Sequence, residues 1–160
     1  MNTDAFVNFM KRYGDITPEA EKDLRERVQA LQRTKGQTII RIGQMATSFF
    51  YIEEGMVRSY YQYGSKQVTI WFSAENDTAA SISSIFNDQP SCETVECIED
   101  CRFLYLTNRD LQDLYRKYEC MNTIGRRETN LFTLQLGHRS YLRCFGLAAP
   151  HRAAHSLFYK

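Results

Sequence analysis

Short runs of alternating apolar and polar residues fill the middle of the chain, from residue 36 to residue 106. A period of two is typical of β-strands, because successive side chains of a strand point to opposite faces of the sheet. Ile40 and Ile42 share one such face, and a turn at Glu54-Gly55, typical of a β-hairpin, separates two further runs. The alternating positions that flank this turn are Phe50, Ile52, Val57 and Ser59. The pattern predicts mainly β structure.

Turn residues divide these runs at regular intervals. Glycines recur every 7–12 residues, at Gly36, Gly43, Gly55 and Gly64. This is the spacing of turns in a β-sandwich or barrel, where glycine supplies the positive φ that other residues resist. In KQVTIWFSA one face holds Val68, Ile70 and Phe72, and the other holds Gln67, Thr69 and Trp71. The last strand pair surrounds a turn at Glu99-Asp100 and contains Val95, Cys97, Phe103 and Tyr105. We therefore expect a compact β-roll over residues 36–106.

Two helices are predicted before the roll, in residues 1–35 of the same domain. Thr3 can cap a first helix through Tyr13, with an apolar face of Phe6, Phe9 and Met10. The segment ITPEAEKDLRERVQALQ predicts a second helix, with Thr17 as N-cap and Pro18 in the first helical position. Its expected buried stripe is Leu24, Val28 and Leu31.

Further helices are predicted after the roll, in residues 107–145, followed by a tail, 146–160. Thr107 with Asp110 three positions later is typical of a helix start. Beyond Glu119, a largely apolar series recurs at spacings of three, four and seven: Met121, Ile124, Leu131, Leu134, His138, Leu142 and Phe145. Its seam residues are Met121, Ile124, Leu131, Leu134 and Leu142. Such a stripe either packs on the chain's own roll or forms a seam with a second copy. We expect the second arrangement, a homodimer.

Two patterns in the roll carry a resemblance to a known family. G-x-x-I-x-x-x-G occurs at residues 36–43, and Y-I-x-x-G-x-V-x-x-Y occurs at residues 51–60. They resemble the cyclic-nucleotide-binding β-roll of the CRP/FNR family of transcription regulators, over residues 5–135. The resemblance implies a double-stranded β-helix, or jelly roll, flanked by N-terminal helices and a long C-terminal dimerisation helix. It also implies an effector-sensing domain that acts in transcription regulation.

The family's phosphate-binding cassette reads approximately F-G-E-L-A-L and then R-[ST]-A, with Glu on the ribose hydroxyl and Arg on the cyclic phosphate. The corresponding stretch here, which we call the cassette, is AASISSIFNDQPSCETVEC, residues 79–97. Ile82 or a neighbouring serine stands in the place of the Glu, and Ser91 or Cys92 in the place of the Arg. The resemblance assigns to the ligand Ser81, Ile82, Ser83, Ser84, Ser91 and Cys92.

Without that arginine, tight binding of cyclic AMP is not expected, because a hydroxyl cannot replace the charge-assisted contact that a phosphate requires. Backbone N–H groups of a short helix at residues 81–86 can still hold a weaker anion. Arg58 and Arg102 are candidates for a relocated anion partner or are strand-surface charges. Trp71, the only tryptophan, is a stacking platform or a packing residue. The effector is thus an unknown small molecule, for which an anion is one candidate, and no cofactor is expected.

Composition narrows the possible location of the protein and the chemistry of its cysteines. No apolar run reaches the roughly 18–20 residues that span a bilayer, and the N-terminus has no hydrophobic signal region, so we expect a cytoplasmic protein with no membrane partner. The five cysteines, an odd number, predict reduced thiols. Cys92, Cys97 and Cys101 raise the alternative of an iron–sulfur cluster, but strand alternation favours buried thiols that act as small hydrophobes.

The charge is unevenly distributed. Residues 1–128 carry 16 basic and 19 acidic side chains, −3 in total, whereas residues 129–160 carry four basic side chains and no acid. This tail predicts no helix-turn-helix, so sequence-specific DNA binding is not expected from the chain. His151 and His155 have helical metal spacing without an evident third ligand, and no metal site is predicted.

Catalytic motifs are absent from the sequence: it contains no GxSxG, P-loop or HExxH pattern, and all three histidines lie after residue 137. We therefore do not expect an enzyme. The sequence predicts an effector-sensing domain of a CRP/FNR-like regulator. The alternative is a ligand-free dimeric scaffold, an interaction module that keeps the roll and binds no DNA of its own.

Overall fold

The computed structural model describes the backbone of residues 2–144 and the side chains of residues 2–131. The chain divides into two compact units, Met1–Glu128 and Thr129–Lys160, and the first contains the sheets and the site. This division coincides with the loss of acidic residues after Glu128. The predictions for Leu134, Leu142, His151 and His155, and those for the tail 146–160, lie outside the described side chains.

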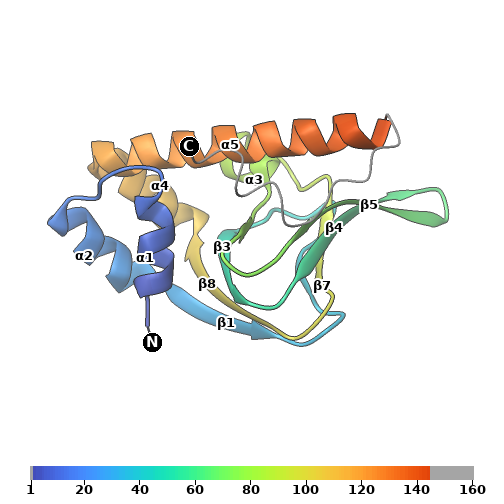
Figure 1. The fold of residues 1–160 in the computed structure, drawn as a ribbon, viewed down its shortest axis with the longest axis horizontal. Helices are drawn as coiled ribbons and strands as arrows, with labels where there is room; N and C mark the ends of the chain where they lie inside the picture. The colour runs from blue at the N-terminus through green and yellow to red at the C-terminus, as the bar shows by residue number, and fades with distance from the viewer. Residues whose placement is uncertain (1, 145–160) are drawn as a thin grey trace. The chain divides into compact units, whose positions relative to one another are not determined.

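Two four-stranded antiparallel sheets confirm the predicted β-roll (Figure 1). The first sheet has the order β1-β8-β3-β6 and the second the order β2-β7-β4-β5. The strands of the first sheet are β1 (Gln29–Arg33), β3 (Ser48–Glu54), β6 (Thr78–Ala79) and β8 (Cys101–Thr107). Those of the second are β2 (Thr38–Ile40), β4 (Val57–Tyr63), β5 (Lys66–Ser73) and β7 (Thr94–Cys97).

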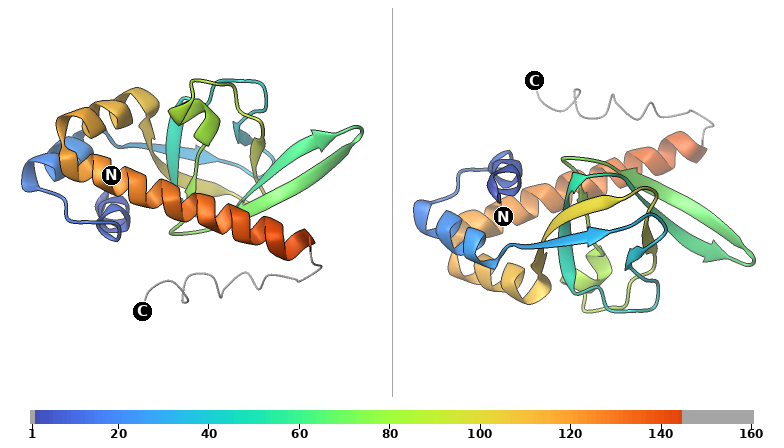
Figure 2. Two further views of the ribbon diagram at one scale, coloured as in Figure 1. Left: turned by 90° about the horizontal axis from the view of Figure 1, so that it is seen from above. Right: turned by 90° about the horizontal axis from the view of Figure 1, so that it is seen from below.

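Two of the predicted hairpins are wrong, because the chain changes sheets at their turns. β3 belongs to the first sheet and β4 to the second, so the chain crosses over at Gly55. It crosses back between β7 and β8, at residues 98–100. The crossings touch: a Cβ on Gly55 would lie 2.5 Å from the carbonyl oxygen of Asp100. The hairpin that does form joins β4 to β5, and its tip extends beyond the other strands (Figure 2).

Strand boundaries and one bulge correct the predicted faces. Ile40 is buried, but Ile42 is 47% exposed because β2 ends at Ile40. In the β4–β5 hairpin the register shifts between Ser59 and Tyr60, which places Trp71 opposite Ser59. Trp71 is 2% exposed and is therefore a packing residue, not an exposed stacking platform.

Five helices accompany the sheets in the described part of the chain. They are α1 (Asp4–Lys11), α2 (Pro18–Arg27), α3 (Ile82–Phe86), α4 (Asn108–Lys117) and α5 (Glu119–Cys144). Thr17 and Thr107 cap α2 and α4 as predicted, by accepting the backbone N–H of Ala20 (3.3 Å) and Asp110 (3.1 Å). Thr3 precedes α1, but its hydroxyl accepts from Arg25 (2.8 Å) and caps nothing.

The second helix is shorter than predicted. It ends at Arg27, and the following QALQR forms β1, in which Leu31 lies opposite Phe103 of β8. Leu24 and Val28 are buried, yet Val28 already has an extended backbone. The ladder with β8 supplies hydrogen-bond partners that a helix would otherwise provide, so tertiary pairing outweighs local helical propensity.

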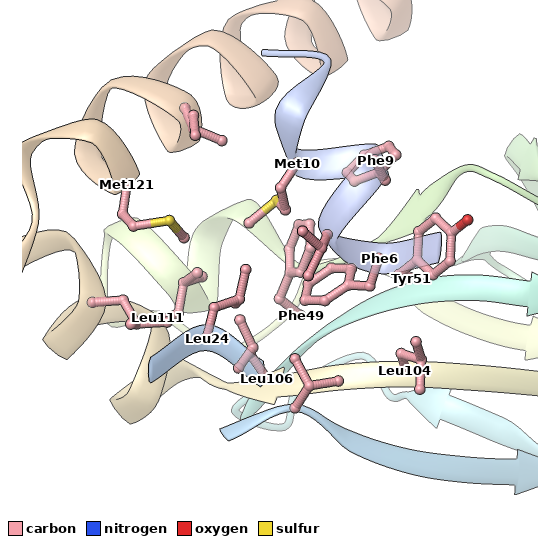
Figure 3. Close-up of a cluster of buried hydrophobic side chains, with 14 of the residues drawn as sticks. Phe6, Phe9, Met10, Leu24, Phe49, Tyr51, Leu104, Leu106, Leu111 and Met121 are labelled. Atoms are coloured by element: carbon pink, nitrogen blue, oxygen red, sulfur yellow. The ribbon is translucent and has the colours of Figure 1, made fainter. Parts of the chain in front are cut away.

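The helices α1, α2 and α4 gather at one side of the roll and close its main core (Figure 1). Phe6 of α1 packs on Tyr51 of β3 with ring centroids 5.6 Å apart, and Phe9 packs on the same ring at 5.3 Å (Figure 3). Other buried members of this core are Val7, Met10, Leu24, Phe49, Leu104, Leu106, Leu111 and Leu114. The predicted apolar face of the first helix is thus confirmed.

The first turns of α5 complete this core. Met121 and Ile124, assigned by the sequence pattern to the dimer seam, are 0% exposed and pack within their own chain. Any seam with a second copy must therefore begin after Ile124. Among the predicted seam residues whose side chains are described, Leu131 is partly exposed. Gly125 has a packing role, since a Cβ there would lie 2.4 Å from the ring of Tyr115 on α4.

Candidate functional site

The cassette is fully folded around the short helix α3. Its return loop is tied to the helix by the backbone N–H of Gln89, which donates to the Ser83 carbonyl (3.1 Å), and by the Ser84 hydroxyl, which donates to the Gln89 carbonyl (2.9 Å). The β2–β3 loop contacts the cassette on its other side. There the backbone N–H of Gly43 donates to the Ser91 carbonyl (2.8 Å), and the N–H of Ser91 donates to the Gln44 carbonyl (2.9 Å). These bonds fix the shape of the cassette without any ligand.

Three of the predicted site residues come together as a polar group. The Ser83 hydroxyl lies 3.3 Å from the hydroxyl of Ser81 and 3.6 Å from the thiol of Cys92. Ser84, by contrast, is buried and has a structural role, because its hydroxyl also accepts the backbone N–H of Ala46 (3.1 Å). Ile82 is partly buried at the start of α3.

The structure distinguishes the two positions at which the family's arginine was expected. Ser91 is 2% exposed, and its hydroxyl donates to the carbonyl of Glu93 (2.9 Å) and accepts that residue's N–H (3.3 Å). Cys92 is exposed and faces Ser83 of α3. A long side chain therefore has room at Cys92 and none at Ser91.

Neither proposed substitute for that arginine has a hydrogen bond or ion pair, among the described residues, with the polar group of Ser81, Ser83 and Cys92. Arg58 alternates along β4 with the inward Val57 and Ser59, so it lies on the outer face, where it pairs with Glu96 (3.1 Å). Arg102 pairs with Glu54 (3.0 Å), and both side chains are exposed. Residues 79–97 contain no lysine or arginine. Both residues are thus strand-surface charges.

A carboxylate that the sequence reasoning missed belongs to the cassette itself. Oε2 of Glu93 accepts a hydrogen bond from the Ser59 hydroxyl and another from Nε1 of Trp71 (2.9 Å). Burial raises the pKa of Glu93, while the two donors act in the opposite direction. One feature of the sequence indicated a buried polar group here: Ser59 occupies an inward strand position, and a buried hydroxyl requires a polar partner.

A second buried carboxylate joins α5 to the strand that precedes the cassette. Oε1 of Glu128 accepts a hydrogen bond from Thr78 of β6 (3.0 Å). Thr78 lies three residues before Ser81, the cassette serine that precedes α3. Burial is the main cause that raises the pKa of Glu128 to about 7; Thr78 opposes this shift and Asp77 adds to it. The contact links the cassette to the long helix.

This carboxylate predicts a pH dependence of stability. Below pH 4.5 Glu128 is protonated in both the folded and the unfolded chain; between 4.5 and about 7 only the unfolded chain ionises, so stability falls as pH rises. Relative to Glu128→Gln, the native chain should lose about 3 kcal/mol of unfolding free energy between pH 4.5 and pH 8. Urea unfolding at both pH values measures this, and parallel curves for the two proteins would contradict it.

The cysteines behave as the strand pattern predicts. Cys97 is 0% and Cys101 is 3% exposed, and burial raises the pKa of Cys97 to about 12, so this thiol stays protonated. Within the described residues no three histidine, cysteine or acidic side chains are close enough to hold a metal. Among the described helices none is long and apolar enough to cross a membrane.

Comparisons with known proteins agree with this architecture. The family model "Cyclic nucleotide-binding domain" matches residues 31–118. No curated protein sequence is significantly similar to the chain. Among solved structures, a cyclic nucleotide-binding domain from Methylobacillus flagellatus superimposes with a TM-score of 0.77 at 14% identity, covering 92% of this chain and 85% of that one.

Two bacterial regulators are also similar in structure. The Catabolite Activator Protein of Thermus thermophilus has a TM-score of 0.68 at 15% identity, with 86% of this chain covered. This chain spans 62% of that protein's length. The sensor domain of the transcriptional regulator DNR from Pseudomonas aeruginosa has a TM-score of 0.65 at 15% identity, covering 92% and 93%. At such identities the likeness shows the shared fold.

Proposed function

This chain belongs to the cyclic nucleotide-binding domain family, and from that premise we propose that it is the effector-sensing domain of a CRP/FNR-like transcriptional regulator whose ligand is not a cyclic nucleotide. The proposal rests on the residues that stand where the family has its phosphate-binding arginine. The cassette keeps its short helix and its return loop, but Cys92, which has a thiol in place of a guanidinium, faces Ser83 of α3, and Glu93 follows it in the chain.

The chemistry of phosphate binding supports the exclusion of cyclic nucleotides. A buried phosphate is held by charged, forked donors, and hydrogen bonds to charged groups are about twice as strong as neutral ones. Ser81, Ser83 and Cys92 offer only neutral groups. The polar surface that they form suits a small ligand that is recognised by hydrogen bonds.

We expect neither cyclic AMP nor cyclic GMP to bind more tightly than roughly high micromolar, since the missing charge-assisted contacts are worth about 1.5–3 kcal/mol each. Isothermal titration calorimetry measures this. Fluorescence of Trp71, the only tryptophan, provides a second readout because its indole donates to Glu93 of the cassette. A submicromolar dissociation constant for either nucleotide would refute the proposal.

The contact between Glu128 and Thr78 supplies a route from the site to the long helix. Thr78 lies in β6, and the chain runs from this strand directly into the cassette. A ligand that shifts α3 acts on β6, and the hydrogen bond at 3.0 Å passes this movement to α5. Occupancy of the cassette would then bias the position of the helix.

The proposal includes a homodimer formed through α5. Replacing Leu131 and Leu134 together by glutamate would put four like charges, two from each subunit, into one interface. We expect the native chain to sediment as a dimer at about 50 μM, well above the ~1 μM dissociation constant of a modest interface, and the double variant to sediment as a monomer. A Met121→Leu variant is the control, because that residue is buried in its own chain. A monomeric native chain would contradict the proposal.

A ligand-free dimeric scaffold is the competing function. It is favoured by one observation, that Ser59 and Trp71 satisfy Glu93 from within the roll. Native mass spectrometry of gently purified protein separates the two. A sensor domain should retain an additional small mass that is lost on denaturation, and a scaffold should show the mass of the chain alone.

A further inference from the structure

We infer that Glu93 is the specificity-determining residue of the cassette: its carboxylate excludes anions from the site and leaves it to neutral or positively charged ligands. The inference rests on the proposed function, because it concerns the ligand of the same site. It goes beyond the absence of the family's arginine, because it attributes the exclusion of anions to a carboxylate that the site contains.

The backbone of Glu93 is held firmly next to the position of the missing arginine. Glu93 follows Cys92 directly, and the hydroxyl of Ser91 binds both its N–H and its carbonyl (3.3 and 2.9 Å). Its side chain reaches inward to Ser59 of β4 and Trp71 of β5, both in the second sheet. The carboxylate is therefore fixed at the inner end of the cassette.

The arrangement of donors leaves part of the carboxylate available. Ser59 and Trp71 both donate to Oε2, and among the described side chains none donates to Oε1. An ionised carboxylate has about four acceptor sites, so Oε1 can accept a donor from a ligand. Burial raises the pKa of Glu93, and the hydrogen bonds from Ser59 and Trp71 oppose this shift because they favour the ionised form.

The electrostatics of this position oppose an anion. No salt bridge in the described part of the chain involves Glu93, so no basic side chain neutralises it. In the interior a negative charge is screened much less than at the surface, so the ionised carboxylate of Glu93 opposes the entry of an anion into the cassette. An arginine at Cys92 would itself pair with Glu93 before it could bind a phosphate.

This predicts that restoring the arginine alone does not restore anion binding. Cyclic AMP is the probe, followed by calorimetry and by the fluorescence of Trp71. Cys92→Arg should bind it no more tightly than the native chain, because the guanidinium pairs with Glu93. Cys92→Arg combined with Glu93→Gln should bind it at least tenfold more tightly than Cys92→Arg, since glutamine keeps the shape and can still accept from Ser59 and Trp71.

Equal affinity of Cys92→Arg and the double variant would overturn the inference, whether both bind or neither does. Cys92→Arg combined with Glu93→Ala repeats the comparison if the glutamine variant fails to fold. The result is independent of the proposed function's own test. Tight binding of cyclic AMP by the native chain would refute the proposed function, whereas the difference between the two arginine variants reports on Glu93.

Discussion

Replacing Gly55 by alanine is expected to lower the free energy of unfolding by about 3 kcal/mol, combining backbone strain with overpacking. Gly55 has φ 95°, a conformation that side chains with a Cβ rarely adopt. The new Cβ would also lie 2.5 Å from the carbonyl oxygen of Asp100 and 2.7 Å from Sγ of Cys101. That backbone cannot easily move, because Cys101 starts β8 and pairs with Arg33.

Gly36→Ala is the matched control for this prediction. Gly36 also has a positive φ, 83°, but no heavy atom lies within 4 Å of a Cβ built there. Only the backbone strain applies, and we expect a loss of about 1 kcal/mol. Urea unfolding followed by circular dichroism measures both variants. Equal losses would show that the two crossings between the sheets do not pack as described.

Replacing Phe6 by alanine should cost about 3–4 kcal/mol, the usual range for a buried aromatic side chain. Phe6 is 0% exposed, and its ring lies 6.3 Å from that of Phe49 and 5.6 Å from that of Tyr51 (Figure 3). The vacancy would open between α1 and β3, where three rings now fill the space. The first helix is therefore expected to be an integral part of the domain.

Phe86→Ala, at the end of α3, provides the comparison for the same chemical change. Phe86 is 46% exposed, so truncation removes little buried surface and should cost about 0.5 kcal/mol. Thermal unfolding of both variants and the native chain measures the difference. A loss from Phe6→Ala no larger than that from Phe86→Ala would mean that α1 does not close the core.

Local chemistry was enough to predict the caps of α2 and α4 and the position of the turn at Gly55, although not the cap of α1. Thr17 and Thr107 cap helices because their hydroxyls reach an N–H three residues ahead, a contact contained in one turn of chain. The glycine at position 55 is needed for its positive φ whichever strand follows. Sequence reasoning could not tell which sheet that strand joins, since a turn to a neighbouring strand and a crossing to the other sheet begin alike.

The error in the second helix has the same origin. The apolar residues Leu24, Val28 and Leu31 are spaced as on a helix, and nothing local ends that pattern at Arg27. The boundary is set by β8, more than seventy residues later in the chain, which pairs with residues 29–33. A partner so distant in sequence leaves no trace in a short window of residues.

The cassette was located from the sequence, and its central polar residues, Ser81, Ser83 and Cys92, do come together. Glu93 was missed for a physical reason. It lies one residue before β7, where alternation does not yet determine direction. Its partner Trp71 turns inward through the shifted register of the β4–β5 hairpin, which the sequence pattern did not reveal.

We expect the cassette to hold a small effector that is not a cyclic nucleotide. A high-resolution crystal structure of the protein, purified without added ligand, tests this most directly. We predict additional density between α3 and Cys92, with a ligand donor group at Oε1 of Glu93. A bound cyclic nucleotide, or a cassette occupied by ordered water alone, would contradict the claim.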